Sequence, residues 1–266
     1  MHHSRRVGLA LAFCAALVGS LSAHAESSLE MAMPATFGSL DAGTYAQSGK
    51  RVGDRHLSVE KLENGNVRIL STVGIDGGAS TVAQAILTPI DGGRALRLLR
   101  QESRSLDANG DPLGVLSIDH VKRLATCAET DRAQPSVRTL ELPERDRVVN
   151  VAMNLLFEPL VRDRAETVDF QIFVCRPRPY LVSFRARVSR HIPAVNGTHE
   201  IIEVGYEPRG GLVSLIVRQF APRLVFWFDP ARSNAWIAHR LPLYSSGPDV
   251  VVVREGVSYE RLENGT

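Results

Sequence analysis

Hydrophobic and polar residues alternate with a period of two over residues 167–174 and again over residues 182–189. Side chains on a β-strand point alternately to opposite faces, so this pattern predicts two strands that each have one apolar and one polar face. Sheets covered on one side only are typically antiparallel. The second half of the chain therefore predicts an antiparallel sheet with one face in water.

Turn-forming residues separate further candidate strands. Asn64-Gly65 stands between apolar segments at residues 57–62 and 67–73, and such a pair favours the positive φ angles of a tight hairpin. Other predicted strands cover residues 81–88, 95–106, 113–121, 137–142, 199–206, 212–220, 223–229, 235–241 and 250–254. About a dozen strands with short turns predict a mainly β (α+β) fold, a curved antiparallel sheet or half-barrel meander.

Residues 146–160 have a helical pattern instead. Val149, Met153, Leu156 and Leu160 recur at spacings of three and four, which predicts a helix with one apolar stripe. Asp146 is the expected N-cap. An apolar helix must be buried, so we expect it to pack on the apolar face of the sheet.

Residues 1–25 have the pattern of a secretory signal peptide. Arg5 and Arg6 precede an apolar stretch over residues 7–19, and Ala23-His24-Ala25 forms a cleavage site. The apolar stretch is shorter than the roughly 20 residues that a bilayer span needs. We expect cleavage after Ala25 and a periplasmic or secreted protein with no membrane span in the mature chain. Since no Pro-, Gly- or Ser-rich linker divides residues 26–266, they are expected to form a single domain.

Two cysteines, Cys127 and Cys175, follow the predicted cleavage site. Thiols of exported proteins are usually oxidised, so we expect a disulfide between them. A reactive thiol pair is the alternative, but there is no Cys-x-x-Cys motif to favour it.

Charge argues against one class of partner. The chain has 31 Lys and Arg against 29 Asp and Glu, and removal of Arg5 and Arg6 with the signal leaves 29 against 29. A balanced chain is a poor general binder of polyanions, so no nucleic-acid partner is expected.

The chain has no clear catalytic or cofactor motif. Gly-x-Ser-x-Gly, phosphate loops and dinucleotide fingerprints are absent. Asp107, Asn109 and Asp111 are similar to the start of a calcium loop, but Pro112 and Ile118 occupy the positions of its glycine and glutamate, so they are expected to form an ordinary turn.

The histidines also give no evidence of a site. They are scattered and are expected on the surface; they are His56, His120, His191, His199 and His239. We therefore expect no metal and no cofactor, while a hydrolase with a dispersed catalytic site stays an alternative.

Large apolar side chains occupy both faces of the strand at residues 224–228. Either a helix or loop covers its second face, or the surface is a concave site for a lipid-like ligand or a partner segment. The residues predicted to line such a site are Met153, Leu156, Phe226, Trp227 and Trp236.

The hairpin at residues 107–113, the single apolar helix, and the strand, Asp-Pro turn and returning strand of residues 226–241 resemble exported proteins of unknown function with a sheet like that of the lipoprotein carriers LolA and LolB. In those carriers an antiparallel half-barrel wraps helices and its hollow receives acyl chains. The resemblance implies a non-enzymatic cell-envelope protein that binds a lipid, an acyl chain or an envelope protein. A scaffold that binds its partner at a sheet edge is another alternative.

Overall fold

The computed structural model describes residues 29–129, 136–176, 178–194, 198–209, 224–244 and 247–264. The predicted signal peptide and the predicted strand at residues 212–220 lie outside this part of the chain. The strands are β1 (Glu30–Ala32), β2 (Gly38–Ala46), β3 (Arg51–Lys61), β4 (Val67–Gly74), β5 (Ser80–Ile90), β6 (Ala95–Leu106), β7 (Pro112–Asp119), β8 (Leu124–Glu129), β9 (Ser136–Glu141), β10 (Val168–Val174), β11 (Tyr180–Ile192), β12 (Ile201–Pro208), β13 (Val225–Phe228), β14 (Trp236–Pro242) and β15 (Asp249–Arg254). The helices are α1 (Met153–Val161), α3 (Tyr259–Asn264) and a short 3-10 turn, η1 (Asp91–Gly93).

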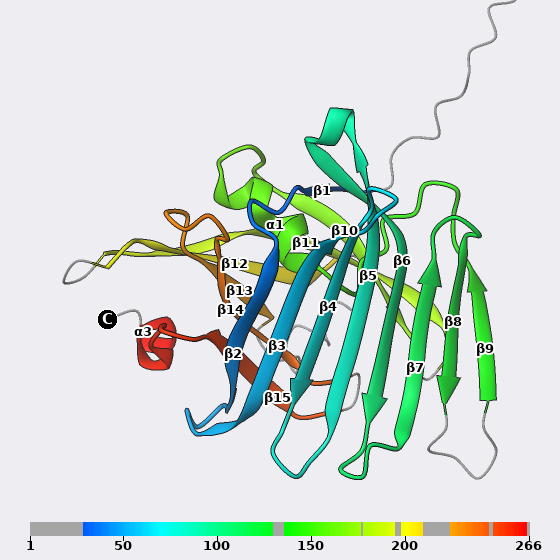
Figure 1. The fold of residues 1–266 in the computed structure, drawn as a ribbon, viewed down its shortest axis with the longest axis horizontal. Coiled ribbons are helices and arrows are strands. Elements are labelled where there is room, and N and C mark those ends of the chain that lie inside the picture. The colour runs from blue at the N-terminus through cyan, green and yellow to red at the C-terminus, as the bar shows by residue number, and fades with distance from the viewer. Residues whose placement is uncertain are drawn as a thin grey trace, which may run out of the picture.

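These strands form one antiparallel sheet of fifteen strands, which confirms the predicted mainly β fold. Strands β2 to β9 follow each other as one meander and β10 to β15 as another (Figure 1). The two meanders join where β15 pairs with β2, with Val251 opposite Tyr45. Among the described residues, the hydrogen-bonded path ends at β9 and β10 and does not close into a barrel. Strand β1 pairs separately with β6.

The predicted hairpin at Asn64-Gly65 is present, with one difference in its backbone. Only Gly65 has a positive φ, of 84°, whereas a positive φ was predicted for both residues. The Asn64 side chain instead accepts a hydrogen bond from the N–H of Asn66 at 3.1 Å. The asparagine therefore favours this turn by bonding to the backbone, as Asn side chains commonly do in turns.

The predicted helix at residues 146–160 is half wrong. Helix α1 begins at Met153, and Ala152 before it has a left-handed φ of 65°. Residues 146–149 are extended and residues 150 and 151 form a bend, and we call residues 146–151 the strap. The N–H of Val149 donates to the carbonyl of Gln171 on β10 at 2.8 Å, and the N–H of Gln171 donates to the carbonyl of Arg147 at 2.8 Å.

The strap is extended because its apolar residues are needed on two opposite sides. Val148 packs with Cys127 and Phe173, whereas Val149 and Val151 belong to the main core with α1. A helix separates consecutive side chains by only about 100°, while an extended segment points them to opposite sides. Asp146 is accordingly not a helix cap.

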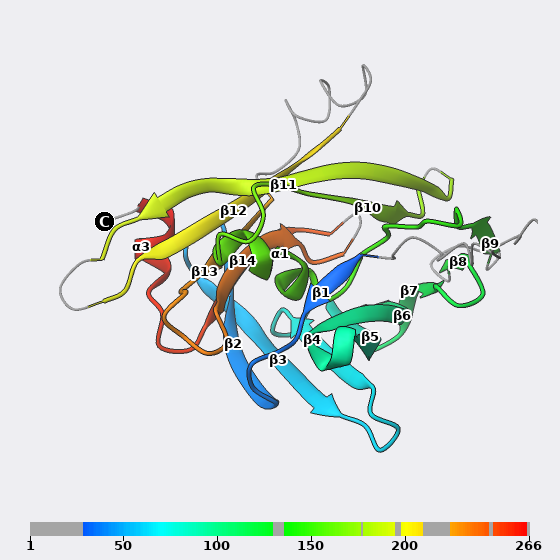
Figure 2. The same cartoon turned by 90° about the horizontal axis from the view of Figure 1, so that it is seen from above.

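Helix α1 lies on the inner face of the curled sheet, as predicted for the apolar helix. It contacts β1, β10, β11 and β12, and from above it is seen between the strands of the second meander and those of the first (Figure 2). Phe157 has no accessible surface, and its ring packs against Phe170, Tyr206 and Phe226 with centroid separations of 5.2–5.7 Å. These aromatic contacts fill one part of the space inside the sheet.

The outer face of β12 to β15 is also covered. Trp227, Val251 and Val253 form a second apolar cluster with Leu262 of helix α3. The Trp227 indole N–H donates to the buried carboxylate of Glu203 at 3.1 Å. Of the two explanations offered for an apolar residue on each face of β13, cover by a helix therefore holds for this face.

Candidate functional site: an apolar cavity beside a partly buried arginine

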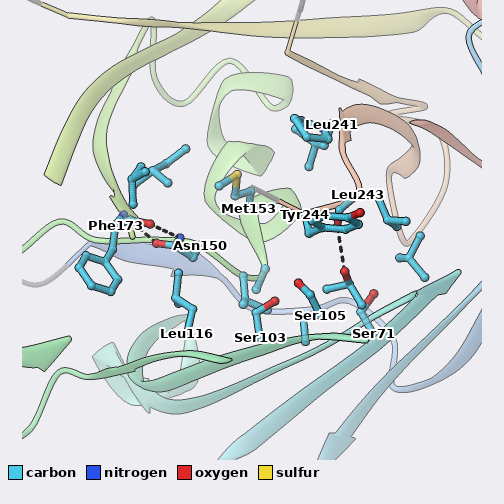
Figure 3. A pocket seen from close by; sticks show the side chains of 18 of the residues that line it. Ser71, Ser103, Ser105, Leu116, Asn150, Met153, Phe173, Leu241, Leu243 and Tyr244 are labelled. Carbon is cyan, nitrogen blue, oxygen red and sulfur yellow. Dashed lines mark hydrogen bonds between the residues drawn. The ribbon is translucent and has the colours of Figure 1, made fainter. Parts of the chain in front are cut away.

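A cavity of about 640 Å³ lies between the two meanders of the sheet. Ser71 and Tyr244 lie at one side of it, Asn150 and Phe173 at the other, and Met153 of α1 lies near the middle (Figure 3). A volume of this size is within the range of about 300–1,000 Å³ that is usual for small-ligand pockets.

Most of the lining is apolar, because the inward-facing positions of β3 to β7 alternate with outward-facing polar ones. Leu57, Ile69, Ala83 and Leu116 line the first meander's side. Across the cavity the lining comes from α1, from the end of β10 and from β13 to β15, including Met153, Ile172, Phe226, Leu241 and Val252. The cavity can thus accept an apolar chain.

Arg55 of β3 is the exception in this lining. Its neighbours on the same strand face, Leu57 and Val59, are buried apolar residues. The guanidinium lies 4.5 Å from the centre of the Trp236 ring, and its Nε donates to the Ser71 hydroxyl at 3.0 Å. Burial lowers the pKa of Arg55 to about 10, so the group stays charged at neutral pH.

His239 of β14 is the second polar group beside Arg55. Its Nδ1 lies 3.3 Å from Arg55 Nη1, and its ring stacks on Phe226 at 5.2 Å. Burial, followed by the charge of Arg55, holds the pKa of His239 well below its usual range. A guanidinium can only donate, so Nδ1 accepts and the proton of the neutral ring is on Nε2.

Arg55 has no carboxylate partner within the part of the chain that the structure describes. Ser71 and His239 are neutral and use one N–H each. Of the five N–H donors of a guanidinium, the other three, including both on Nη2, have no acceptor among those residues. Nη2 is also not one of the fully buried polar atoms, which agrees with the position of Arg55 in the cavity wall.

The second arginine in the cavity wall, Arg176, has a different environment. Its Nε lies 3.2 Å from a carboxylate oxygen of Glu129, which also pairs with Arg138 at 2.6 Å. Arg55 and Arg176 both line the cavity, but only Arg176 forms an ion pair with a described residue.

The predicted disulfide between Cys127 and Cys175 is confirmed, and both residues line the cavity. Cys127 is on β8 and Cys175 follows β10, so the bond links opposite ends of the sheet. We call the gap that this bond crosses the seam, and the strap lies in it as well. Asn150 of the strap donates to the carbonyl of Phe173 at 2.8 Å and accepts from its N–H at 2.9 Å, so this side chain pairs with β10 (Figure 3).

A buried polar network holds the strap against β6. The amide oxygen of Gln101 accepts from the N–H groups of Asn150 and Val151 at 2.7 and 2.8 Å. Its amide nitrogen lies 3.0 Å from the carbonyl of Val148 and 2.8 Å from His120 Nε2. All four hydrogen-bonding positions of this glutamine are therefore used.

His120 and Asp146 form a buried pair in that network, with their side chains only 6% and 7% exposed. Nδ1 of His120 lies 2.8 Å from the Asp146 carboxylate. A histidine and aspartate in this arrangement can serve as a base, but here the second ring nitrogen faces Gln101. The pair therefore holds the strap and has no free nitrogen to offer a nucleophile.

The prediction that all five histidines lie on the surface is wrong for His120 and His239, both of which are buried. The three others pair with acidic residues and keep more than half of their side-chain surface: His56 with Asp41, His191 with Glu200 and His199 with Asp229. The sequence did not show this, because a histidine is buried only where it has a partner, and Asp146 and Arg55 are far from His120 and His239 in the chain.

The five residues predicted to line a ligand site have different positions. Met153 and Phe226 line the cavity. Leu156 is buried in the main core, and Trp236 is buried under Arg55. Trp227 belongs to the cluster on the outer face, away from the cavity, because its position on β13 is offset by one from Phe226.

The sequence analysis did not identify three residues of this site, namely Arg55, Ser71 and His239. One signal was available for Arg55. It continues the alternation of Leu57 and Val59 towards the start of β3, so a strand extended by two residues would have placed a cation on the apolar face. The pairing with His239, which is 184 residues away, left no signal in the sequence.

The residues considered for calcium form a turn. The Asp107 carboxylate accepts from the N–H groups of Asn109 and Asp111 at 2.8 and 2.9 Å.

Within the described residues, no helix combines the length and apolar character required to cross a bilayer.

No protein-family model and no curated protein sequence matches this chain. The chain is similar in structure to a β-barrel-like protein of the domain of unknown function DUF1849 from Brucella abortus. The similarity covers 82% of this chain and 97% of that protein, with 9% sequence identity and a TM-score of 0.41. A likeness at this level carries no argument about function.

Proposed function

We propose that this protein binds a hydrophobic ligand in the cavity between the two meanders and does so without chemical turnover. The observation that carries the proposal is the cavity of about 640 Å³, which has a mainly apolar lining although α1 and the aromatic core fill the rest of the interior. Burial of apolar surface contributes about 25 cal/mol per Å², so a ligand with a long apolar part would gain much of its affinity here.

The arrangement of polar groups supports binding over catalysis. The buried His120–Asp146 pair is saturated by Gln101, and Nδ1 of His239 faces Arg55. In a hydrolase with a dispersed site, the alternative from sequence, a base beside the cavity would need a free ring nitrogen, and neither His120 nor His239 offers one.

The proposal includes an envelope location and a role similar to that of the LolA and LolB carriers. It is supported by the signal-like pattern of residues 1–25 and by the Cys127–Cys175 disulfide, which is typical of oxidising compartments. Binding of another envelope protein in place of a lipid would use the same cavity or a sheet edge, and the structure gives the cavity the better-defined lining.

Native mass spectrometry of the protein purified from its own cells without detergent tests this function. We expect a population whose mass exceeds that of the chain by a small amphiphilic molecule, which organic extraction releases. Repeated spectra of ligand-free protein, together with no uptake of added long-chain lipids, would contradict the proposal.

A further inference from the structure

We infer that the ligand is a single-chain amphiphile with a carboxylate headgroup, such as a long-chain fatty acid, and that Arg55 is the residue that binds this headgroup. This inference rests on the proposed function and names its substrate class. It is carried by a charged side chain that lines an apolar cavity and has no anionic partner among the described residues.

The described residues around Arg55 provide no negative charge to balance its guanidinium. A charge removed from water without a counter-ion is costly, and proteins normally pair it. Ser71, His239 and Trp236 supply a hydroxyl, an imidazole nitrogen and an aromatic face, none of which carries a negative charge. An anion that enters with the ligand would complete the site.

The geometry of the free donors favours a carboxylate. Both N–H groups of Nη2 and one of Nη1 have no acceptor among the described residues. Guanidinium groups bind carboxylates through two parallel N–H···O bonds. Such a fork orients the headgroup, whereas a lone hydroxyl or ester carbonyl would leave donors unpaired.

The amount of positive charge favours a monoanion over a phosphate ester. His239 is neutral because burial keeps its pKa low, and Arg176 is already paired with Glu129. Arg55 is then the one cation for which the described cavity residues provide no counter-charge. A carboxylate balances that single charge, while a dianionic phosphate would leave a negative charge in an apolar site.

The rest of the cavity fits the chain of such a molecule. From Ser71, which contacts Arg55, the cavity runs to Asn150 and Phe173 (Figure 3). Cys127 and Cys175 also line it. Ala83, Leu116 and Met153 lie along it. A headgroup at Arg55 would therefore place the acyl chain between the two meanders, below helix α1.

Three probes with the same C16 chain separate the headgroup from the tail: hexadecanoate, hexadecanol and hexadecyl phosphate. Delipidated protein is titrated with each, using calorimetry and the fluorescence of Trp236 in a Trp227→Phe background. We expect hexadecanoate to bind at least about tenfold more tightly than hexadecanol, because charge-assisted hydrogen bonds are the strong ones.

Two variants and a control assign the preference to Arg55. Arg55→Met keeps the bulk but removes the charge, so it should bind hexadecanoate and hexadecanol equally. Arg55→Lys should retain part of the preference. Arg104→Met, which removes an arginine on the outer face of β6, where Arg104 pairs with Glu102, should behave as the unmodified protein does.

The outcomes are distinguishable from failure of the proposed function. Equal binding of hexadecanoate and hexadecanol by the unmodified protein, or a preference that survives Arg55→Met, would overturn the role of Arg55 while leaving hydrophobic binding intact. Preference for hexadecyl phosphate would overturn the carboxylate. If none of the three probes bound, the inference and the proposed function would both be overturned.

Discussion

Cys127 of β8 and Cys175, which directly follows β10, are bonded to each other although they lie at opposite ends of the sheet. β8 is next to the last strand of the hydrogen-bonded path and β10 is the first, so the bond holds together two ends that backbone pairing leaves open. The strap lies in the same seam, where Asn150 bonds to β10 and Gln101 of β6 bonds to the strap. The interior is therefore enclosed by side chains and one covalent bond where the sheet itself is not closed.

Replacement of both Cys127 and Cys175 by alanine should lower the free energy of unfolding by about 4 kcal/mol, because the bond closes a loop of roughly fifty residues in the unfolded chain. Urea unfolding of the double variant and of the unmodified protein, with and without reductant, measures this difference. Reduction should affect only the unmodified protein. A variant with unchanged stability would show that the strap alone closes the seam.

Gln101→Leu should destabilise the protein by about 3 kcal/mol. The substitution leaves the N–H groups of Asn150 and Val151 and the carbonyl of Val148 without their partner, and buried unpaired groups cost about 1–3 kcal/mol each. Gln84→Leu, on the neighbouring strand and the outer face, should change stability by less than about 0.5 kcal/mol. Equal effects of the two substitutions in thermal unfolding would refute the proposed role of Gln101.

Arg55→Met should make the ligand-free protein more stable, by about 1 kcal/mol, because it removes a partly buried cation that lacks a counter-ion among the described residues and restores an apolar wall. Residues that bind a ligand often lower the stability of the ligand-free protein. Chemical denaturation of delipidated protein tests this expectation. A clear loss of stability in this variant would mean that the Trp236 and Ser71 contacts outweigh the cost of burial.

Acidification from pH 7 to pH 5 should destabilise the ligand-free protein through His239. Burial keeps the pKa of the native residue well below its usual value, whereas in the unfolded chain it titrates near 6.5. Below about pH 6.5 the unfolded state therefore takes up a proton that the native state does not, which costs up to about 1.4 kcal/mol per pH unit.

His239→Gln keeps an acceptor for Arg55 but cannot be protonated, so its unfolding free energy should fall less between pH 7 and pH 5. The carboxylate of Asp169, whose pKa the Arg185 hydrogen bond lowers, loses its contribution at more acidic pH than this window. Parallel pH profiles for the two proteins would rule out His239 as the cause.

The sequence predicted the antiparallel sheet wherever a strand has one apolar and one polar face. It missed β2 (Gly38–Ala46), whose glycines and alanines give little alternation, and β8 (Leu124–Glu129), which is short and follows a polar turn. The disulfide could be predicted because the chain offers only two cysteines after residue 25. The strap was misread because Val148 and Val149 fit the apolar stripe of a helix as well as an extended segment that is buried on both sides.

The candidate site was less accessible to such reasoning. A cavity depends on the combined volume of side chains from strands that are far apart in the chain. A local sequence pattern contains no information about that combined volume. Met153 and Phe226 were correctly placed in the interior because large apolar residues are usually buried. The ends of the strand patterns, where Arg55 lies, are the least certain part of any periodicity.

Substitutions at two neighbouring positions of β5 test the central claim, that the space between the meanders holds the ligand. Ala83 faces the cavity, while Val82 is the preceding residue on the same strand and faces outward. Ala83→Phe should fill part of the cavity and weaken hexadecanoate binding at least about tenfold, since burial of each lost methylene contact is worth about 0.8 kcal/mol. Val82→Phe should bind as the unmodified protein does, and equal affinity in both variants would contradict binding in this cavity.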